Sequence, residues 1–252
     1  MEGRRGEEDT GDESESKAVL PIEVPSDAKI WRFLRAYQYD VDLAATRLRR
    51  QTLWRATPAY GLDIPVRDIR ADTLGVPEQA ATGKAYVLNG TDLKGGPIVV
   101  VHVRRHTTQP QGQDDVTRFG VHILESLEAR LASLAEAKGL GSDPDADPDS
   151  KLCIIFDLSA IAMVNMDMKM AKRIIYMLTH FYPERMGVCL LLSAPALFSA
   201  AWMVIRPWLH PRTQERIAFV KPADLSAHLP NEAIPTFWGG GDAGPYPEPE
   251  RI

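Results

Sequence analysis

Residues 181–220 constrain the fold more than any other part of the chain. They read as a polar turn, a short apolar run, an apolar helix over residues 196–209, a charged turn and a second short apolar run. Within residues 196–209 the polar side chains are limited to Ser199 and Arg206. A surface helix normally keeps a polar face, so a helix that is apolar on every side is buried or faces something oily.

This apolar helix is too short to cross a bilayer. At about 1.5 Å per residue, residues 196–209 cover about 21 Å, whereas the hydrocarbon core of a membrane is about 30 Å thick. Two interpretations stay open from composition alone. The helix is either an ordinary buried core helix or a helix that lies against a lipid inside the protein.

Continuous apolar runs predict a sheet that is covered on both faces. Leu152–Asp157 and residues 188–193 are such runs, and Ile217–Val220 follows the apolar helix. Apolar residues at helical spacing predict helices over residues 115–138 and 167–181. The alternation of strand and helix predicts an α/β fold in which helices pack on a mostly parallel sheet.

The first part of the chain predicts a helical hairpin and then a strand hairpin. Ser26 or Asp27 is expected to cap a first helix, and Asp40 opens a second. Residues 85–88 and 98–103 flank a turn that carries three glycines, which is typical of two strands joined in a hairpin.

Charge and cysteine content limit the partners and the compartment that we expect. The chain has 252 residues and a formal net charge of −5, and its basic residues are dispersed. A nucleic-acid partner is not expected, because binding a polyanion usually requires clustered Lys and Arg. Cys153 and Cys189 each lie inside an apolar run, as buried free thiols in a reducing compartment do, although a disulfide between neighbouring strands is the alternative.

The composition also predicts how the chain divides into regions. The acidic start has no apolar segment of the secretory-signal kind and is typical of disorder. We expect a disordered acidic tail over residues 1–25, a helical region over 26–60, a connection over 61–82, the main α/β domain over 83–241 and a C-terminal tail over 242–252.

Motifs for catalysis, metals and cofactors are lacking in the sequence. The histidines form no HExxH motif, and the chain has neither a GxxxxGK[ST] phosphate loop nor a GxSxG elbow. We therefore expect no catalytic residue, no metal and no cofactor. The alternative is a hydrolase that uses Asp157, at the end of a predicted strand, together with a histidine; otherwise Asp157 closes a structural turn.

A series of short motifs occurs in one order and spacing along the second half of the chain. They are Tyr182-Pro183-Glu184-Arg185-Met186-Gly187, Ala194-Pro195, Leu197-Phe198-Ser199, Arg206-Pro207-Trp208-Leu209, Pro211-Arg212-Thr213 and Gly239-Gly240. Nearer the start they are preceded by Arg32-Phe33-Leu34-Arg35-Ala36, Tyr39-Asp40-Val41 and Trp54-Arg55. This series resembles the CRAL-TRIO lipid-binding family, which includes phosphatidylinositol and phosphatidylcholine transfer proteins. The resemblance implies a sheet and helices that enclose a hydrophobic lipid pocket, after a small N-terminal helical region.

The resemblance also implies where a lipid headgroup would bind. In family members that bind phosphatidylinositol, the positions that match Glu184, Thr213 and Arg216 gather around the inositol phosphate. A guanidinium and a hydroxyl are suitable donors to a phosphodiester, and a carboxylate accepts from sugar hydroxyls. The alternative is that Glu184 and Arg216 form a salt bridge that holds two turns together.

The chain departs from the family pattern in three places. Tyr37-Gln38 stands where the family often carries a basic pair, and Arg216 replaces a Lys. After Asp157 the family frequently shows hydroxyl residues implicated in phosphocholine binding, whereas residues 159–164 here are mostly apolar, which does not favour phosphatidylcholine. A more hydrophobic ligand, such as a sterol-, tocopherol- or retinoid-like molecule, remains an alternative to phosphatidylinositol.

In the resembled family the apolar helix acts as a movable gate over the lipid. The residues expected to line the pocket or gate are Leu197, Phe198, Ala201, Trp202, Ile205, Trp208 and Leu209. The resemblance therefore implies a cytoplasmic, peripherally membrane-associated monomer that binds a lipid, contacts membranes transiently and transfers the lipid between them. The alternative role is a lipid sensor that presents its ligand to a partner protein.

Overall fold

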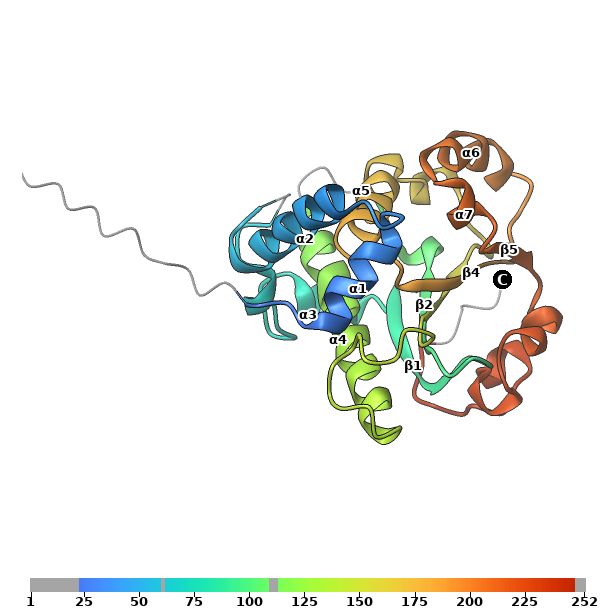
Figure 1. Ribbon diagram of the computed structural model, residues 1–252. Helices are drawn as coiled ribbons and strands as arrows, with labels where there is room; N and C mark the ends of the chain where they lie inside the picture. Colours follow the sequence, from blue (N-terminus) through green and yellow to red (C-terminus); the bar gives the residue numbers. More distant parts are fainter. Residues whose placement is uncertain (1–22, 60–61, 109–112, 248–252) are drawn as a thin grey trace, which may run out of the picture.

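The computed structural model describes residues 23–59, 62–108 and 113–247, and its centre is a five-stranded sheet of order β1-β2-β3-β4-β5 (Figure 1). The strands are β1 (Ala85–Thr91), β2 (Pro97–His102), β3 (Leu152–Asp157), β4 (Met186–Leu192) and β5 (Ile217–Val220). The first two strands pair antiparallel as the predicted hairpin, and β2 to β5 are parallel. The predicted α/β fold with a mostly parallel sheet is confirmed.

Helices precede, connect and follow these strands. They are α1 (Asp27–Ala36), α2 (Val41–Ala56), α3 (Val76–Ala81), α4 (Gln113–Ala137), α5 (Met168–His180), α6 (Phe198–Ile205) and α7 (Pro211–Gln214). The first helix begins after Ser26, whose hydroxyl accepts from the backbone N–H of Lys29 at 3.2 Å. Asp40 caps α2 in the same way, because its carboxylate accepts from the backbone N–H of Leu43 at 2.9 Å. Side-chain caps therefore define the starts of both helices.

The apolar helix is shorter than the sequence predicts. The expected helix spans residues 196–209, whereas α6 covers Phe198–Ile205 and continues as a 3₁₀ turn over Arg206–Trp208. Pro207 explains the early end, because proline has no N–H to donate to the carbonyl of Met203 one turn back.

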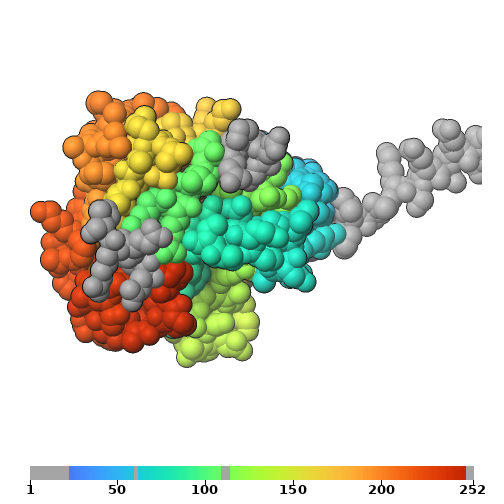
Figure 2. All heavy atoms as spheres, turned by 180° about the vertical axis from the view of Figure 1, so that it is seen from behind, coloured from blue at the N-terminus to red at the C-terminus, as the bar shows by residue number. Residues whose placement is uncertain are grey.

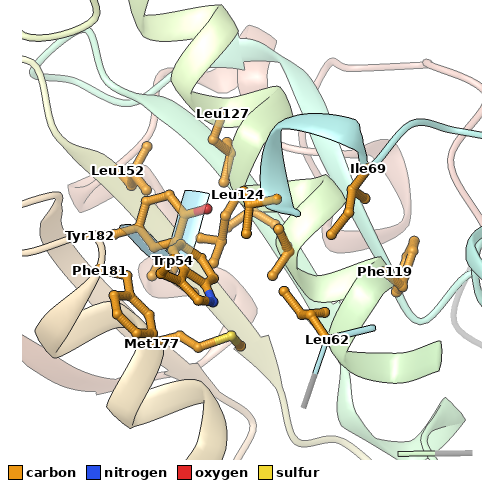
Figure 3. Close-up of a cluster of buried hydrophobic side chains, with 14 of the residues drawn as sticks. Trp54, Leu62, Ile69, Phe119, Leu124, Leu127, Leu152, Met177, Phe181 and Tyr182 are labelled. Atoms are coloured by element: carbon orange, nitrogen blue, oxygen red, sulfur yellow. The ribbon is translucent and has the colours of Figure 1, made fainter. Parts of the chain in front are cut away.

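One face of the sheet packs against the helices of the first half of the chain. Trp54 of α2 is 1 % exposed and stacks on Phe181, with ring centroids 4.0 Å apart, at the centre of this core (Figure 3). Leu127 of α4 and Leu152 of β3 belong to the same cluster. Large apolar side chains from α2, α4 and the end of α5 therefore fix these helices to β1–β3.

The other face of the sheet packs against the C-terminal part of the chain. Cys153 and Ile155 of β3, which alternate with the residues that face the helices, form a cluster with Leu225 and Leu229 from this part. Both cysteines are free and buried, as predicted, and burial raises the pKa of Cys189 to about 12.

The ends of the chain are described only in part. Residues 1–22 of the expected acidic tail and residues 248–252 lie outside the described ranges. Residues 242–247 of the expected C-terminal tail pack on β1, where Tyr246 stacks on Tyr86 with ring centroids 5.4 Å apart. Its hydroxyl also accepts from the backbone N–H of Asn89 at 2.9 Å, so this segment closes the edge of the sheet.

The helical core gives a direct test of stability. Replacing Trp54 with Ala removes a fully buried, stacked side chain and is expected to lower the free energy of unfolding by about 3–5 kcal/mol. Trp31→Ala is the matched control, because Trp31 on α1 is 55 % exposed and its loss should change stability by less than about 0.5 kcal/mol. Chemical denaturation followed by circular dichroism measures both. Equal effects of the two substitutions would contradict this assignment of the core.

Candidate functional site

Three charged side chains meet where β3, β4 and β5 begin. Lys151 precedes β3, Glu184 lies in the turn before β4, and Arg216 precedes β5. The Lys151 ammonium donates to Glu184 Oε2 at 2.9 Å, and Arg216 Nη2 donates to the same oxygen at 3.3 Å. The structure thus brings together Glu184 and Arg216, which the family resemblance singles out, and adds Lys151, which it does not.

The electrostatics of this cluster leave one positive charge in excess. Burial alone would raise the pKa of Glu184, but the bonds and charges of Lys151 and then Arg216 outweigh burial and hold that pKa below its usual value. Two cations therefore share one carboxylate. The side chains of Lys151 and Arg216 are 28 % and 31 % exposed, so their remaining donors are open to an anion.

Thr213 belongs to the turn that carries Arg216. It lies in α7, and its carbonyl accepts from the backbone N–H of Arg216 at 3.1 Å. Its side chain is half-buried and makes no hydrogen bond to any residue in the described ranges. The structure therefore links Thr213 to Arg216 through the backbone, without joining it to Glu184.

An apolar cluster lies directly beside the charged one, between α6 and the sheet. Its buried members are Leu158, Ile161, Cys189, Leu191, Phe198 and Ala201. Met186 and Ile217, both partly buried, pack against it. Arg216 is the residue before Ile217, and its Nη1 donates to the carbonyl of Met186 at 2.8 Å. The charged cluster and the apolar cluster therefore share a boundary at the start of β4 and β5.

Helix α6, which lies over the apolar cluster, is itself partly exposed to solvent. Among the expected gate residues Phe198 and Ala201 are buried, Leu197 is exposed, and Trp202, Ile205, Trp208 and Leu209 are half-buried. Met203 of α6 is 72 % exposed. Figure 1 shows α6 and α7 beyond the β4–β5 end of the sheet, away from α2 and α3, and Figure 2 shows the α6 region in orange on the outer surface.

Two residues near α6 were missed from the sequence. Phe219 of β5 is 53 % exposed, and the ring of Trp202 meets it edge-on with centroids 5.5 Å apart. The sequence could have indicated this contact. Phe219 is two residues after Ile217, and alternation along a strand places both side chains on the face that α6 covers. Lys172 of α5 lies 6.0 Å from the ring centre of Trp208, a contact between helices that no local pattern indicates.

Asp157 is part of a buried hydrogen-bonded chain on the opposite face of the sheet. Its Oδ2 lies 2.8 Å from Nδ1 of His102, and Nε2 of His102 lies 2.8 Å from the hydroxyl of Tyr86. Its Oδ1 accepts from the backbone N–H of Ser159 at 3.0 Å. Burial would raise the pKa of Asp157, but the bonds from His102 and Ser159 outweigh it and lower the pKa. Asp157 is 1 % exposed; one of its carboxylate oxygens binds the turn after β3, and the other pairs with His102 at the end of β2.

Within the ranges that the structure describes, no three His, Cys, Asp or Glu side chains are grouped so as to hold a metal ion. In the same ranges no helix has both the length and the apolar character needed to cross a membrane.

The mostly parallel sheet with helices packed on it agrees with the α/β fold that the sequence motifs implied. Residues 81–240 match the model of the family described as CRAL/TRIO domain. The chain belongs to this family. The crystal structure of Sfh5 shares the fold, with a TM-score of 0.65 and 15 % identity over 87 % of this chain and 73 % of that one.

Curated relatives match most of this chain. The phosphatidylinositol transfer protein CSR1 of Eremothecium gossypii is 33 % identical over 230 residues, which is 89 % of this chain and 49 % of the relative. The CRAL-TRIO domain-containing protein C3H8.02 of Schizosaccharomyces pombe is 26 % identical over 89 % of this chain and 48 % of its own length. The chain thus spans about half the length of these two. The SEC14 cytosolic factor of Candida glabrata is 27 % identical over 90 % of this chain and 74 % of the relative.

The charged cluster predicts how Glu184 titrates. Its carboxyl should titrate below the usual value for Glu of about 4.3, and Lys151→Met should move the midpoint upward. Since folding lowers this pKa, ionised Glu184 contributes stability that is fully present above the unfolded pKa and is lost as the pH falls through the folded pKa. Carboxyl-detected NMR measures the midpoint, with Lys138→Met, which removes the partner of Asp147, as the control. A midpoint unmoved by Lys151→Met would refute the pairing.

Proposed function

We propose that this chain binds a phospholipid, with phosphatidylinositol as the best candidate, and transfers it between membranes without covalent chemistry. The observation that carries the proposal is the shared boundary of the two clusters. Arg216, with its spare donors, is followed directly by Ile217, which packs on the apolar cluster under α6. A phospholipid has the same sequence of parts, with a phosphate at the boundary between a polar headgroup and acyl chains.

The charged cluster suits a phosphodiester with a polyhydroxylated headgroup. Arg216 and Lys151 supply charge-assisted donors to the phosphate, and the hydroxyl of Thr213 supplies one more from the same turn. Ionised Glu184 accepts hydrogen bonds from ring hydroxyls. The Glu184–Arg216 salt bridge by itself is the structural alternative, and the second cation at Lys151 favours ligand binding because a salt bridge alone needs only one.

Apolar contact supplies most of the binding free energy in such a complex. Moving one CH₂ group from oil to water costs about 0.8 kcal/mol, so one chain of about 16 carbons costs on the order of 12 kcal/mol. A hydrogen bond to a charged group contributes only about 1.5–3 kcal/mol. The apolar cluster under α6 therefore accounts for retention of the lipid, and the charged cluster selects which lipid is retained.

The packing of α6 supports a role as a gate. It buries only Phe198 and Ala201, whereas Met203 and Val204 face outward with 72 % and 50 % of their surface exposed. Few buried contacts hold such a helix, so it can move away from the sheet at low cost. Trp202 and Trp208 can then enter the membrane interface, which indole rings favour. We therefore propose a monomer that acts in the cytoplasm and contacts membranes transiently.

The headgroup site predicts a selective loss of transfer. Arg216→Ala and Lys151→Ala are each expected to lower phosphatidylinositol transfer between liposomes by roughly 10- to 100-fold, because each removes a charge-assisted bond to the phosphate. Thr213→Ala should have a smaller effect of the same kind. Transfer of a sterol by the same variants is the control, and an equal loss for every lipid would show structural damage instead of a headgroup site.

The gate predicts a general loss of transfer. Trp202→Asp and Ile205→Asp place a charge on the side of α6 that packs toward the sheet, so exchange of every lipid should fall while the fold remains. Trp31→Asp is the matched control, since Trp31 is an exposed tryptophan on α1, outside the gate. Unchanged exchange in well-folded gate variants would count against a movable α6.

A further inference from the structure

A buried arginine of α1 reaches the turn that carries Glu184. Arg32 is 4 % exposed, and its Nε donates to Oδ1 of Asp145 at 2.5 Å. Its Nη1 donates to the carbonyl oxygen of Pro183 at 2.8 Å. Arg32 lies 151 positions before Pro183 in the sequence, so this bond ties the N-terminal helical region to the turn before β4.

Arg185, the residue that follows Glu184, is held in part by the same carboxylate of Asp145. Arg185 is 3 % exposed, and its guanidinium binds the carboxylate of Glu128 on α4 through Nε at 2.6 Å and through Nη2. Its Nη1 lies 2.9 Å from Oδ1 of Asp145, the oxygen that Arg32 also binds. Asp145 therefore joins Arg32 and Arg185 into one network.

Glu184 is fixed between these two anchored residues in an unusual backbone conformation. Its φ is 60°, in the left-handed region that residues with a side chain seldom adopt. Such a conformation persists where the surroundings hold it. Here the carbonyl of Pro183 and the side chain of Arg185 are both pinned, and the carboxylate of Glu184 is left to meet Lys151 and Arg216.

The two neighbouring charge clusters differ in balance. Arg32 and Arg185 are matched by Asp145 and the half-buried Glu128, so these ion pairs balance two cations with two carboxylates and leave no surplus charge for a ligand. The Glu184 cluster, by contrast, has two cations for one carboxylate. The buried network is therefore suited to hold the turn, and the partly exposed cluster is suited to bind.

We propose that Arg32, Asp145 and Arg185 are positioning residues for headgroup recognition, so that α1 helps to set which lipid the protein selects. This inference rests on the proposed headgroup role of Glu184, Lys151 and Arg216. The positioning residues do not touch the lipid. They act by fixing the backbone on both sides of Glu184.

The test compares two buried arginines that differ in what they hold. Arg32→Met removes the bond to Pro183 and leaves Asp145 paired with Arg185. Arg118→Met is the matched control, because Arg118 is 6 % exposed and binds the carboxylate of Asp63 and the carbonyl of Leu74, away from the Glu184 turn. The measurement is the ratio of phosphatidylinositol to phosphatidylcholine transferred from vesicles with matched acyl chains, alongside the thermal midpoint of each variant.

Arg32→Met is expected to lower the ratio of phosphatidylinositol to phosphatidylcholine transfer about tenfold, because one charge-assisted bond to the headgroup is misplaced. Arg118→Met should lower the thermal midpoint and leave this ratio unchanged. If Arg32→Met does not fold, Arg32→Lys decides, since an ammonium keeps the charge but cannot bond both partners in the planar guanidinium geometry. An unchanged ratio in the folded Arg32 variant, while Arg216→Ala loses selectivity, overturns the positioning role alone. If Arg216→Ala also keeps its selectivity, the headgroup site itself fails, and the positioning role fails with it.

Discussion

The structure depends on a sheet whose two faces are both apolar and must both be kept from water. Along β3 every residue from Leu152 to Ile155 is buried, and alternate side chains enter different clusters on the two faces. Helices α2, α4 and α5 cover one face over β1–β3, and the C-terminal turns cover the other. Over β4 and β5 the first face is covered by α6, a helix of eight residues that buries two side chains. The cover is thinnest at this end of the sheet.

This uneven cover explains why the polar residues of the proposed site lie where they do. The turns before β4 and β5 open beside the thinly covered end, and they carry Glu184 and Arg216. Charges placed there remain partly in water, so their desolvation cost is small, and they still touch the edge of the apolar cluster through Met186. We propose that a ligand with a charged end and an apolar end binds at this boundary, and that the Arg32–Asp145–Arg185 network holds the turn that carries Glu184.

The sequence predicted the features that depend on local patterns. A continuous apolar run marked β3 with its observed bounds. Ser26 or Asp27, of which Ser26 is the cap, and Asp40 marked the starts of α1 and α2, because capping is a contact between near neighbours. The length of α6 was overestimated, although Pro207 carried the signal for its end. The family resemblance indicated Glu184, Thr213 and Arg216 as candidate headgroup residues, and apolar composition alone did not distinguish a gate from a core helix.

What the sequence did not reveal depends on contacts between distant residues. Lys151 follows an acidic loop and reads as an ordinary solvated lysine until β3 and β4 pair and bring it to Glu184. The bond from Arg32 to Pro183 joins positions in different regions of the chain, so no periodicity indicates it. The same holds for Tyr246, which lies in an expected tail but stacks on β1.

In the proposed complex the acyl chains lie between α6 and the β4–β5 end of the sheet. A phosphatidylinositol that carries a photoreactive diazirine in one acyl chain tests it most directly, with the labelled residues mapped by mass spectrometry. We expect labelling of the apolar cluster under α6, including Leu191, Phe198 and Trp202. Labelling confined to the C-terminal turns on the opposite face, or no labelling under conditions that saturate binding, would contradict it.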